Sequence, residues 1–440
     1  MNMFNRLSKI GFLLAAVIFS VTVFGGTADK TFDGYTLVSP NFHTTTYLVD
    51  MDGNVVHYWL NDGTPALSAY LLENGNLLRT STIPEQSSNT QNSPPNRGFG
   101  GMGFGGGMMG GFGGMGGFGG MPGFGGGGMN MMGLTGAGGT MPPDWLHTNA
   151  IDYNPDLDQI AISCYGFSEI WFIDHSTTTE QAKGHTGGKY GKGGDLIYRW
   201  GNPRAYRAGT EDDQKFFNQH DVHWIPKGRP GAGHLLVFNN GPYRPGGDYS
   251  SVDEIVTPVD ENGNYPLEKG KSYGPKDAVW SYTAPNKSDF FSMHISGAER
   301  QPNGNTLICS GAYGVFFEVT PDKKVIWRCA YTGGDSPEGA DLKSQFGGGM
   351  MGGFGGRGGG FGGMPGFGGQ PQTPTEKLPR FVVSRENPAV AGLKGMPSTL
   401  QVWGGGTGFG VMDTQTFRVY RYTADYPGLK GKDLKPIEEK

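Results

Sequence analysis

The pattern that most constrains the fold of this chain is a repeated pair of short apolar strands joined by a tight turn. In one form the turn is Asn-Gly, as in residues 70–78 and 301–308. In the other form the second strand ends on an aromatic residue, as in residues 46–59 and 315–327. Asn-Gly and Asp-Gly supply the positive φ angles that a two-residue hairpin turn requires. Further strands that close on an aromatic residue are predicted at 196–200, 278–282 and 417–422.

The spacing of these hairpins indicates one all-β architecture. Two hairpins per unit of about 40–50 residues are typical of a four-stranded propeller blade. Helical periodicity is nearly absent after residue 28. We therefore expect an all-β fold, a single β-propeller of about six four-stranded blades, over residues 29–440. A stacked β-sandwich or two small barrels is the alternative architecture.

Two low-complexity tracts interrupt the hairpin pattern. The chain has 80 glycines, and 39 of them lie in residues 98–139 and 346–369, mixed with Phe and Met and almost no charge. Both tracts contain the octet Gly-Gly-Met-Pro-Gly-Phe-Gly-Gly. Segments this rich in Gly lose much entropy on ordering and have few side chains to bury. We expect both to be disordered insertions in the propeller, and they offer a route to self-association.

Residues 1–28 have the layout of a cleavable signal peptide. Arg6 and Lys9 precede an uncharged, largely apolar run from Ile10 to Phe24, and small residues follow up to Ala28. A run of this length is short for a membrane span, although an uncleaved N-terminal anchor is the alternative. No later stretch approaches the roughly 20 apolar residues of a spanning helix. We therefore expect a periplasmic or secreted protein with no stable membrane span after cleavage.

Charge and cysteine content exclude several classes of protein. The formal net charge is −5 and no basic stripe is present, so nucleic acid is not an expected partner. The three cysteines, Cys164, Cys309 and Cys329, are too few for a disulfide framework. We expect three buried free thiols, with a Cys309–Cys329 bridge as the alternative.

The placement of the histidines predicts a shared site. His147, His220 with His223, and His294 stand just before or at the start of predicted inner strands in three different blades. The inner strands of a propeller converge at its axis, so these side chains can meet only there. Arg244 follows a strand and can enter the same space. The other five histidines, His57 among them, lie in predicted outer strands or loops.

No metal or cofactor is expected at this site. His220 and His223 are three residues apart, a spacing that places side chains on opposite faces of a regular strand. No Asp, Glu or Cys stands at a spacing typical of a zinc site. The Gly-x-Gly-x-x-Gly matches in the Gly-rich tracts do not lie between a strand and a helix, so they do not indicate a dinucleotide.

At these residues the sequence resembles the bacterial arylsulfotransferase family. The likeness is carried by Asp144-Trp-x-His-x-Asn149, Gln219-His220, Phe238-Asn-Asn-Gly with Arg244, and the run from His294 to Asn305. It extends over most of residues 33–425, outside the two Gly-rich tracts. The resemblance implies a periplasmic or secreted six-bladed propeller that transfers a sulfuryl group from an aryl sulfate to a phenol, without a nucleotide donor.

The resemblance also implies roles for the site residues. His294 is the nucleophile and forms a sulfohistidine intermediate. Arg244 and His220 stabilise the sulfuryl oxygens, and His147 acts as acid and base on the phenolic oxygen, with Asn149 orienting. His223 is a further substrate-binding candidate.

Two other classes of function remain open from the sequence. One is a non-catalytic extracellular binding or adhesion module whose Gly-rich loops mediate assembly. The other is a different small-molecule enzyme, such as a lyase or hydrolase, on the same scaffold.

Overall fold

The computed structural model describes residues 30–41, 43–61, 63, 65–81, 145–332, 378–385 and 414–438. The predicted signal peptide and both Gly-rich tracts lie outside these residues. None of the helices in the described part of the chain is both long enough and apolar enough to cross a membrane.

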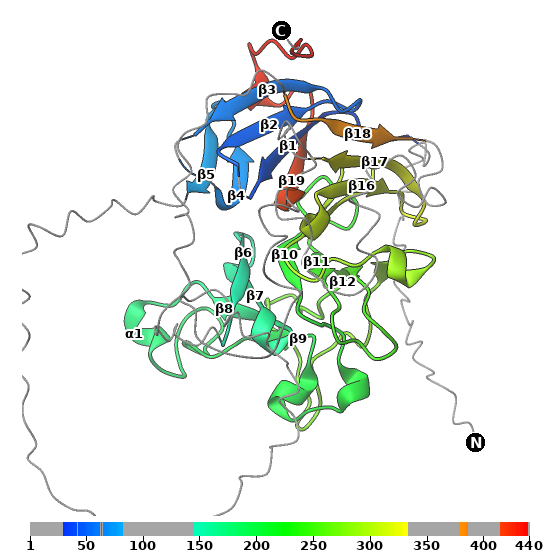
Figure 1. The fold of residues 1–440 in the computed structure, drawn as a ribbon. Coiled ribbons are helices and arrows are strands. Elements are labelled where there is room, and N and C mark those ends of the chain that lie inside the picture. The colour runs from blue at the N-terminus through cyan, green and yellow to red at the C-terminus, as the bar shows by residue number, and fades with distance from the viewer. Residues whose placement is uncertain are drawn as a thin grey trace, which may run out of the picture.

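The described residues form an all-β, propeller-like arrangement (Figure 1). The first sheet has the order β19-β1-β2-β3, and a two-stranded sheet β4-β5 follows it. These strands are β1 (Tyr35–Pro40), β2 (Thr45–Val49), β3 (Val55–Leu60), β4 (Pro65–Leu71), β5 (Leu77–Ser81) and β19 (Thr416–Tyr422).

Three further sheets follow along the chain, each built from consecutive antiparallel strands. The sheet β6-β7-β8-β9 contains β6 (Thr148–Asn154), β7 (Gln159–Cys164), β8 (Glu169–Asp174) and β9 (Tyr198–Trp200). The sheet β10-β11-β12-β13 contains β10 (His220–Trp224), β11 (Leu235–Asn239), β12 (Ser251–Ile255) and β13 (Trp280–Tyr282). The five-stranded sheet contains β14 (Gly297–Arg300), β15 (Thr306–Ser310), β16 (Val315–Val319), β17 (Val325–Tyr331) and β18 (Phe381–Ser384).

Helix is almost absent from the described residues. The α-helix α1 spans only Thr179–Ala182. The other helical elements are single 3₁₀ turns: η1 (Tyr165–Phe167), η2 (Pro203–Tyr206), η3 (Glu211–Asp213), η4 (Lys287–Asp289), η5 (Gly311–Tyr313) and η7 (Pro427–Leu429).

Four sheets thus have the four or five strands of a blade, which confirms the all-β, propeller-like fold. The number of six blades is not confirmed by the described residues and stays a prediction. All three cysteines are free and buried, as expected.

The predicted hairpins are present, but their turns are three residues long. In the β4–β5 hairpin Leu72 N donates to Asn76 O at 2.9 Å, and Gly75, with φ of +84°, closes the loop. The same bonding encloses residues 51–53, 261–263 and 302–304, each with a Gly at positive φ in the third position. This is the three-residue hairpin loop with a left-handed Gly at its end. The sequence prediction of two-residue turns was wrong, although the Gly positions were right.

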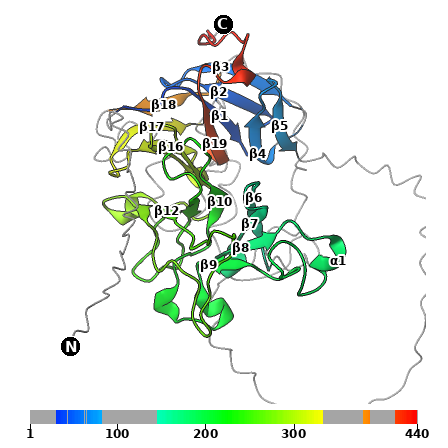
Figure 2. The same cartoon turned by 180° about the vertical axis from the view of Figure 1, so that it is seen from behind.

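The innermost strands of the sheets form an arc. β10 contacts both β6 and β14, β14 contacts β19, and β19 contacts β4. Both views show β6, β10 and β19 near the middle of the molecule and β3 and α1 at its edge (Figures 1 and 2). The strand predicted at 417–422 is present as β19, and it is the inner strand of the first sheet.

The hydrophobic core lies between neighbouring sheets. One cluster joins β8 and β10 through Phe172 and Val222, and the next joins β11 and β16 through Phe238 and Phe317. Two more clusters fill the spaces between the five-stranded sheet and the first sheet, and between the first sheet and β4. Stacked blades with apolar contact on both faces are what the near-continuous apolar strands require.

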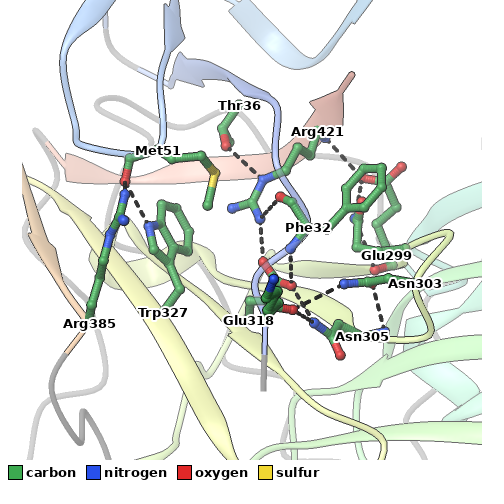
Figure 3. A network of polar contacts seen from close by, with 12 residues as sticks. Phe32, Thr36, Met51, Glu299, Asn303, Asn305, Glu318, Trp327, Arg385 and Arg421 are labelled. Atoms are coloured by element: carbon green, nitrogen blue, oxygen red, sulfur yellow. Dashed lines mark hydrogen bonds and ion pairs between the residues drawn. The ribbon is translucent and has the colours of Figure 1, made fainter. Parts of the chain in front are cut away.

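A buried polar network joins the first sheet to the five-stranded sheet (Figure 3). Arg421 of β19 forms an ion pair with Glu318 of β16, and both side chains are 0% exposed. Glu318 also accepts hydrogen bonds from Asn305 Nδ2 at 2.6 Å and from the backbone N of Phe32 at 2.7 Å. Arg421 in turn donates to Thr36 Oγ1 at 3.3 Å. We call Arg421, Glu318, Asn305, Phe32 and Thr36 the closure cluster, because they link residues near both ends of the described chain.

Candidate active site

Three histidines stand at the inner ends of three neighbouring sheets. His147 immediately precedes β6, His220 is the first residue of β10, and His294 lies three residues before β14. Since β10 contacts β6 and β14, the three segments meet at the arc of inner strands. The sequence prediction that these histidines come from different blades agrees with this arrangement.

Ring contacts bring His147 and His220 together around one tyrosine. The ring centroids of His147 and His220 lie 6.4 Å apart. Tyr165 of η1 lies 4.7 Å from His147 and 5.5 Å from His220. His294 is close enough that its charge contributes to lowering the pKa of His220. These contacts form a cluster of imidazole and phenol rings, which suits an aromatic ligand.

Burial keeps His220 neutral. His220 is 2% exposed. Burial lowers the pKa of its imidazole to about 3, and the charges of Arg418, His147 and His294 contribute to this lowering. The hydrogen bond to Asn240 opposes this shift. At neutral pH the ring is therefore uncharged.

His294 stands on a strained loop. Burial also lowers the pKa of His294, and a hydrogen bond with Gln415 opposes the shift. The next two residues, Ile295 and Ser296, have φ angles of +48° and +94°. A β-branched residue at positive φ is a genuine outlier, and such strain is concentrated at functional sites. His147 has a φ angle of +46°, and Asp221 next to His220 has one of +59°, so all three histidine segments contain a non-glycine residue at positive φ.

Hydrogen bonds from a neighbouring turn hold the strained loop. Ser296 Oγ accepts from Gly311 N at 3.0 Å, and Ser292 Oγ accepts from Ala312 N at 3.1 Å. Ser296 Oγ also donates to Ser292 Oγ at 2.8 Å. The loop that carries His294 is thus fixed at both sides of the histidine.

A buried ion pair lies beside the histidines. Asp221 Oδ1 is 3.0 Å from Arg418 Nε, and both side chains are less than 10% exposed. Asp221 Oδ2 accepts from the backbone N of Ala298 at 2.9 Å, and Arg418 Nη2 donates to the backbone O of Asn149 at 3.0 Å. A Cβ on Gly297 would lie 2.4 Å from Asp221 Oδ2, so this close approach requires Gly. The pair therefore connects β6, β10, β14 and β19.

Asn149 is anchored by its side-chain amide. Its Nδ2 donates to Gln219 O at 2.9 Å, which places Asn149 next to the residue that precedes His220. Its Oδ1 has no hydrogen-bond partner among the described residues. Asn149 thus lies beside the residue that precedes His220 and two residues after His147.

Arg244 has its described contacts away from the histidines. Its Nη2 donates to Ser251 Oγ at 2.8 Å, and its guanidinium lies over the ring of Tyr249 at 4.3 Å and near Phe217 at 5.6 Å. Phe217 precedes His220 by three residues, so Arg244 lies at the border of the site. Among the described residues, the contacts of Arg244 are with Ser251, Tyr249 and Phe217, and none is with a histidine of the site.

His223 shows where strand alternation failed as an argument. The pairing with β11 places His220 opposite Phe238 and His223 opposite Leu236, with a bulge between them. Phe238 and Leu236 are two residues apart, so both histidines lie on the same face of the sheet. The prediction of opposite faces was wrong, because Asp221 at φ of +59° forms the bulge. His223 itself is hydrogen-bonded locally, to Asp221 O at 2.9 Å.

Sequence reasoning missed Tyr165, Asn240 and Arg418. Asn240 lies inside the Phe238-Asn-Asn-Gly run that carried the family resemblance, and an Asn pair directly after an apolar strand was the available signal. Arg418 is one of two arginines, with Arg421, in a mostly buried strand, and this is unusual because arginine is rarely buried unless it is paired. Tyr165 had no comparable signal.

The donor set of the site is imidazole, amide, guanidinium and phenol. Across residues 30–438, as far as they are described, no three or more His, Cys, Asp or Glu side chains form a group suited to a metal ion. Neutral imidazoles can attack an electrophile or exchange protons, and guanidinium and amide groups can stabilise an anion. The arrangement therefore suits transfer of an anionic group.

Comparisons with known proteins address the family. No curated protein matches the chain. Among solved structures the chain is similar to a protein of unknown function from Bacteroides caccae, at 8% sequence identity and a TM-score of 0.25, over 69% of this chain and 60% of that chain. This chain thus spans less than two thirds of the length of that protein.

A family model gives the more specific result. Residues 130–345 match the model of the arylsulfotransferase (ASST) family. The matched segment contains His147, His220, Arg244 and His294. It also contains the strands from β6 to β17. This match supports the arylsulfotransferase family, which the sequence resemblance predicted.

Proposed function

We propose that this protein transfers a sulfuryl group from an aryl sulfate to a phenolic acceptor through a sulfohistidine intermediate. The observation that carries the proposal is the convergence of His147, His220 and His294 from three sheets, within the segment that matches the family. Family membership supports aryl sulfotransfer in general, and the neutral imidazoles support a nucleophilic route.

His294 is the proposed nucleophile. Because burial lowers its pKa, its imidazole is neutral at pH 7 and has a lone pair for attack on sulfur. A bond forms between the imidazole nitrogen and sulfur, the bond between sulfur and the aryl oxygen breaks, and the phenolic oxygen leaves with a proton from His147. In the second half, the oxygen of the acceptor phenol attacks sulfur, the nitrogen–sulfur bond breaks, and the proton of the acceptor returns to His147.

Charge stabilisation is the proposed role of Arg244 and Asn149. The transferring group is anionic, and donors aimed at its oxygens stabilise the transition state most when water is excluded. Asn149 lies within the cluster, and Arg244 at its border is within reach of a ligand that extends from the histidines toward Phe217. Tyr165, between His147 and His220, is the proposed contact for the aromatic ring.

The site of action is proposed to be the periplasm or the exterior of the cell. This rests on the signal-like layout of residues 1–28. N-terminal sequencing of the exported protein is expected to find a start between about residues 25 and 29, and an intact Met1 in the soluble fraction would contradict it.

Turnover of a chromogenic aryl sulfate tests the proposed function. With a phenol as acceptor we expect ping-pong kinetics, in which the first phenol is released before the acceptor binds. When the protein is incubated with a labelled aryl sulfate and the covalent intermediate is trapped at alkaline pH, we expect the label on one histidine, His294. Absence of turnover across a broad panel of aryl sulfates and phenols would contradict the proposal and favour a non-catalytic binding module.

A further inference from the structure

We propose that Asn240 is a positioning residue that holds His220 in its Nδ1-protonated form and ties that ring to the loop that carries His294. The consequence for catalysis rests on the proposed function. The position of Asn240 directly after β11 places it between β10 and the segment that precedes β14.

Three hydrogen bonds define the orientation of Asn240. The residue is 0% exposed. Its Nδ2 donates to Ser292 O at 2.7 Å and to Ile295 O at 2.8 Å. Its Oδ1 lies 2.7 Å from His220 Nδ1.

These contacts assign the tautomer of His220. A primary amide has two N–H donors on nitrogen, and here both point at backbone carbonyls, which can only accept. The orientation of the amide is therefore set by its network, and Oδ1 faces the imidazole. Because Oδ1 can only accept, His220 Nδ1 must donate its hydrogen, and a neutral ring then has its lone pair on Nε2.

The same side chain couples His220 to His294. Ser292 and Ile295 flank His294, and their carbonyls are the two acceptors for Asn240. Asn240 is itself held by its backbone, because Ser250 Oγ donates to Asn240 O at 2.7 Å and accepts from Ser292 N at 2.9 Å. One buried amide therefore fixes the positions of two site histidines on different sheets.

The assigned tautomer changes the role of His220. A ring with Nδ1–H engaged by Asn240 offers an acceptor at Nε2, so it does not donate to the sulfuryl oxygens as the resemblance implied.

Nitrogen NMR of the imidazoles tests the tautomer without any assay of turnover. In ¹⁵N-histidine-labelled protein, the His220 signals are those lost in His220→Gln. We expect Nδ1 to be of the pyrrole type and Nε2 of the pyridine type, and this form is expected to persist on acidification to about pH 4.5, because burial lowers the pKa of the ring to about 3. An Nε2-protonated or doubly protonated ring at pH 7 in the wild type would overturn the inference, and this measurement needs no variant at Asn240.

Two variants test the role of Asn240 itself. Asn240→Ala is expected to leave His220 as a mixture of tautomers. Asn240→Asp places a carboxylate at Nδ1 and is expected to raise the pKa of His220, so that the ring becomes doubly protonated at a higher pH. Asn239→Ala is the matched control, since the adjacent Asn239 is equally buried but bonds to Phe217 N and Lys215 O. A His220 spectrum that is the same in Asn240→Ala and the wild type would refute the positioning role.

Kinetics then connect Asn240 to the proposed function. Asn240→Asp is expected to lower kcat by roughly 10–100-fold, in line with the loss of a partner that orients a functional histidine. In the pH profile of kcat, the decline of activity on the acid side is expected to move to higher pH in Asn240→Asp. A purely structural effect would not cause this shift. A wild type with the expected spectrum but no sulfuryl transfer would refute the proposed function and leave the tautomer assignment intact. Turnover in the wild type with unchanged kinetics in Asn240→Asp would refute the role of Asn240 in catalysis and leave the proposed function and the tautomer assignment intact.

Discussion

The closure cluster and the histidine site are two buried polar regions that share one strand, and they satisfy their polar groups differently. β19 contributes Arg421 to the closure cluster and Arg418 to the site. In the closure cluster a carboxylate and a guanidinium are paired and also bonded to amide and backbone groups. In the site burial lowers the pKa of His220 and of His294, so these two rings are neutral, and the backbone around them is strained.

This difference indicates that one strand, β19, contributes to the stability of the fold at Arg421 and to the candidate active site at Arg418. A buried charge that loses its partner is strongly destabilising, so every member of the closure cluster depends on the others. A neutral imidazole costs less to bury and remains ready to react. We therefore expect substitutions in the closure cluster to change the free energy of unfolding, and substitutions in the histidine site to change turnover.

The largest expected effect is on turnover and comes from His294→Asn. Loss of the nucleophile is expected to abolish transfer from aryl sulfate to phenol, while the thermal midpoint stays within a few degrees, because His294 is only partly buried. His57→Asn is the matched control, since His57 in β3 packs against Trp59 at the edge of the first sheet. Steady-state rates and thermal unfolding measure both, and full activity in His294→Asn would transfer the nucleophile role to another histidine.

Arg421→Ala tests the opposite side of the comparison. The variant leaves Glu318 buried without its counter-ion and is expected to reduce the free energy of unfolding by about 3–5 kcal/mol. Turnover per folded molecule is expected to be unchanged. Arg385→Ala removes an ion pair with Asp52 whose side chains are 52% and 72% exposed, and it is expected to cost less than about 1 kcal/mol. Denaturant unfolding compares the two, and equal effects would contradict the special role of the closure cluster.

Arg244→Ala tests whether Arg244 belongs to the histidine site. If Arg244 reaches the sulfuryl oxygens when substrate is bound, its loss is expected to lower kcat by roughly 100-fold, as for removal of one preorganised donor. If it serves only to hold Tyr249 and Ser251, the unfolding free energy changes and the rate does not. The ratio of kcat in Arg244→Ala to kcat in Arg385→Ala distinguishes these outcomes.

The smallest expected effect is a change in the acid dependence of stability in His220→Gln. The folded pKa of His220 is about 3, below the value near 6.5 of an unfolded histidine. Between these values the unfolded chain binds a proton that the folded site does not, so stability falls as pH falls, by up to about 1.4 kcal/mol per pH unit from this group. His220→Gln is expected to show a shallower slope between pH 6.5 and 4.5 in denaturant titrations. An unchanged slope would mean that His220 does not stay neutral in the folded state.

Local sequence signals predicted much of the fold. Hairpins, turn glycines and strands at the expected places follow from alternation and from turn residues, which act over a few neighbours. The length of the turns was misjudged, because Asn74-Gly75 suits both a two-residue loop and the longer one observed. The position of β19 as an inner strand depends on contacts with residues nearly 400 positions away, and local patterns do not contain this information.

The sequence predicted the histidines of the site but not the residues that determine the orientation and protonation of those histidines. The starts of strands indicated His147, His220 and His294 correctly as neighbours. The bulge at Asp221, the amide of Asn240 and the pairing of Arg418 all depend on cross-sheet contacts. These contacts decide which nitrogen carries a proton, and a linear pattern does not reveal them.

The pairing of β1 with β19 also has a consequence for how the protein folds. Thr36 and Arg421 are 385 residues apart, yet they are hydrogen-bonded partners in one sheet. Tight hairpins such as β4–β5 close loops of only a few residues, whereas this seam closes nearly the whole chain and has a much larger entropic cost. We therefore expect the seam to form last, after the rate-limiting step. Interactions formed after the transition state slow unfolding without speeding folding, so the seam should govern how long the folded protein persists rather than how fast it forms.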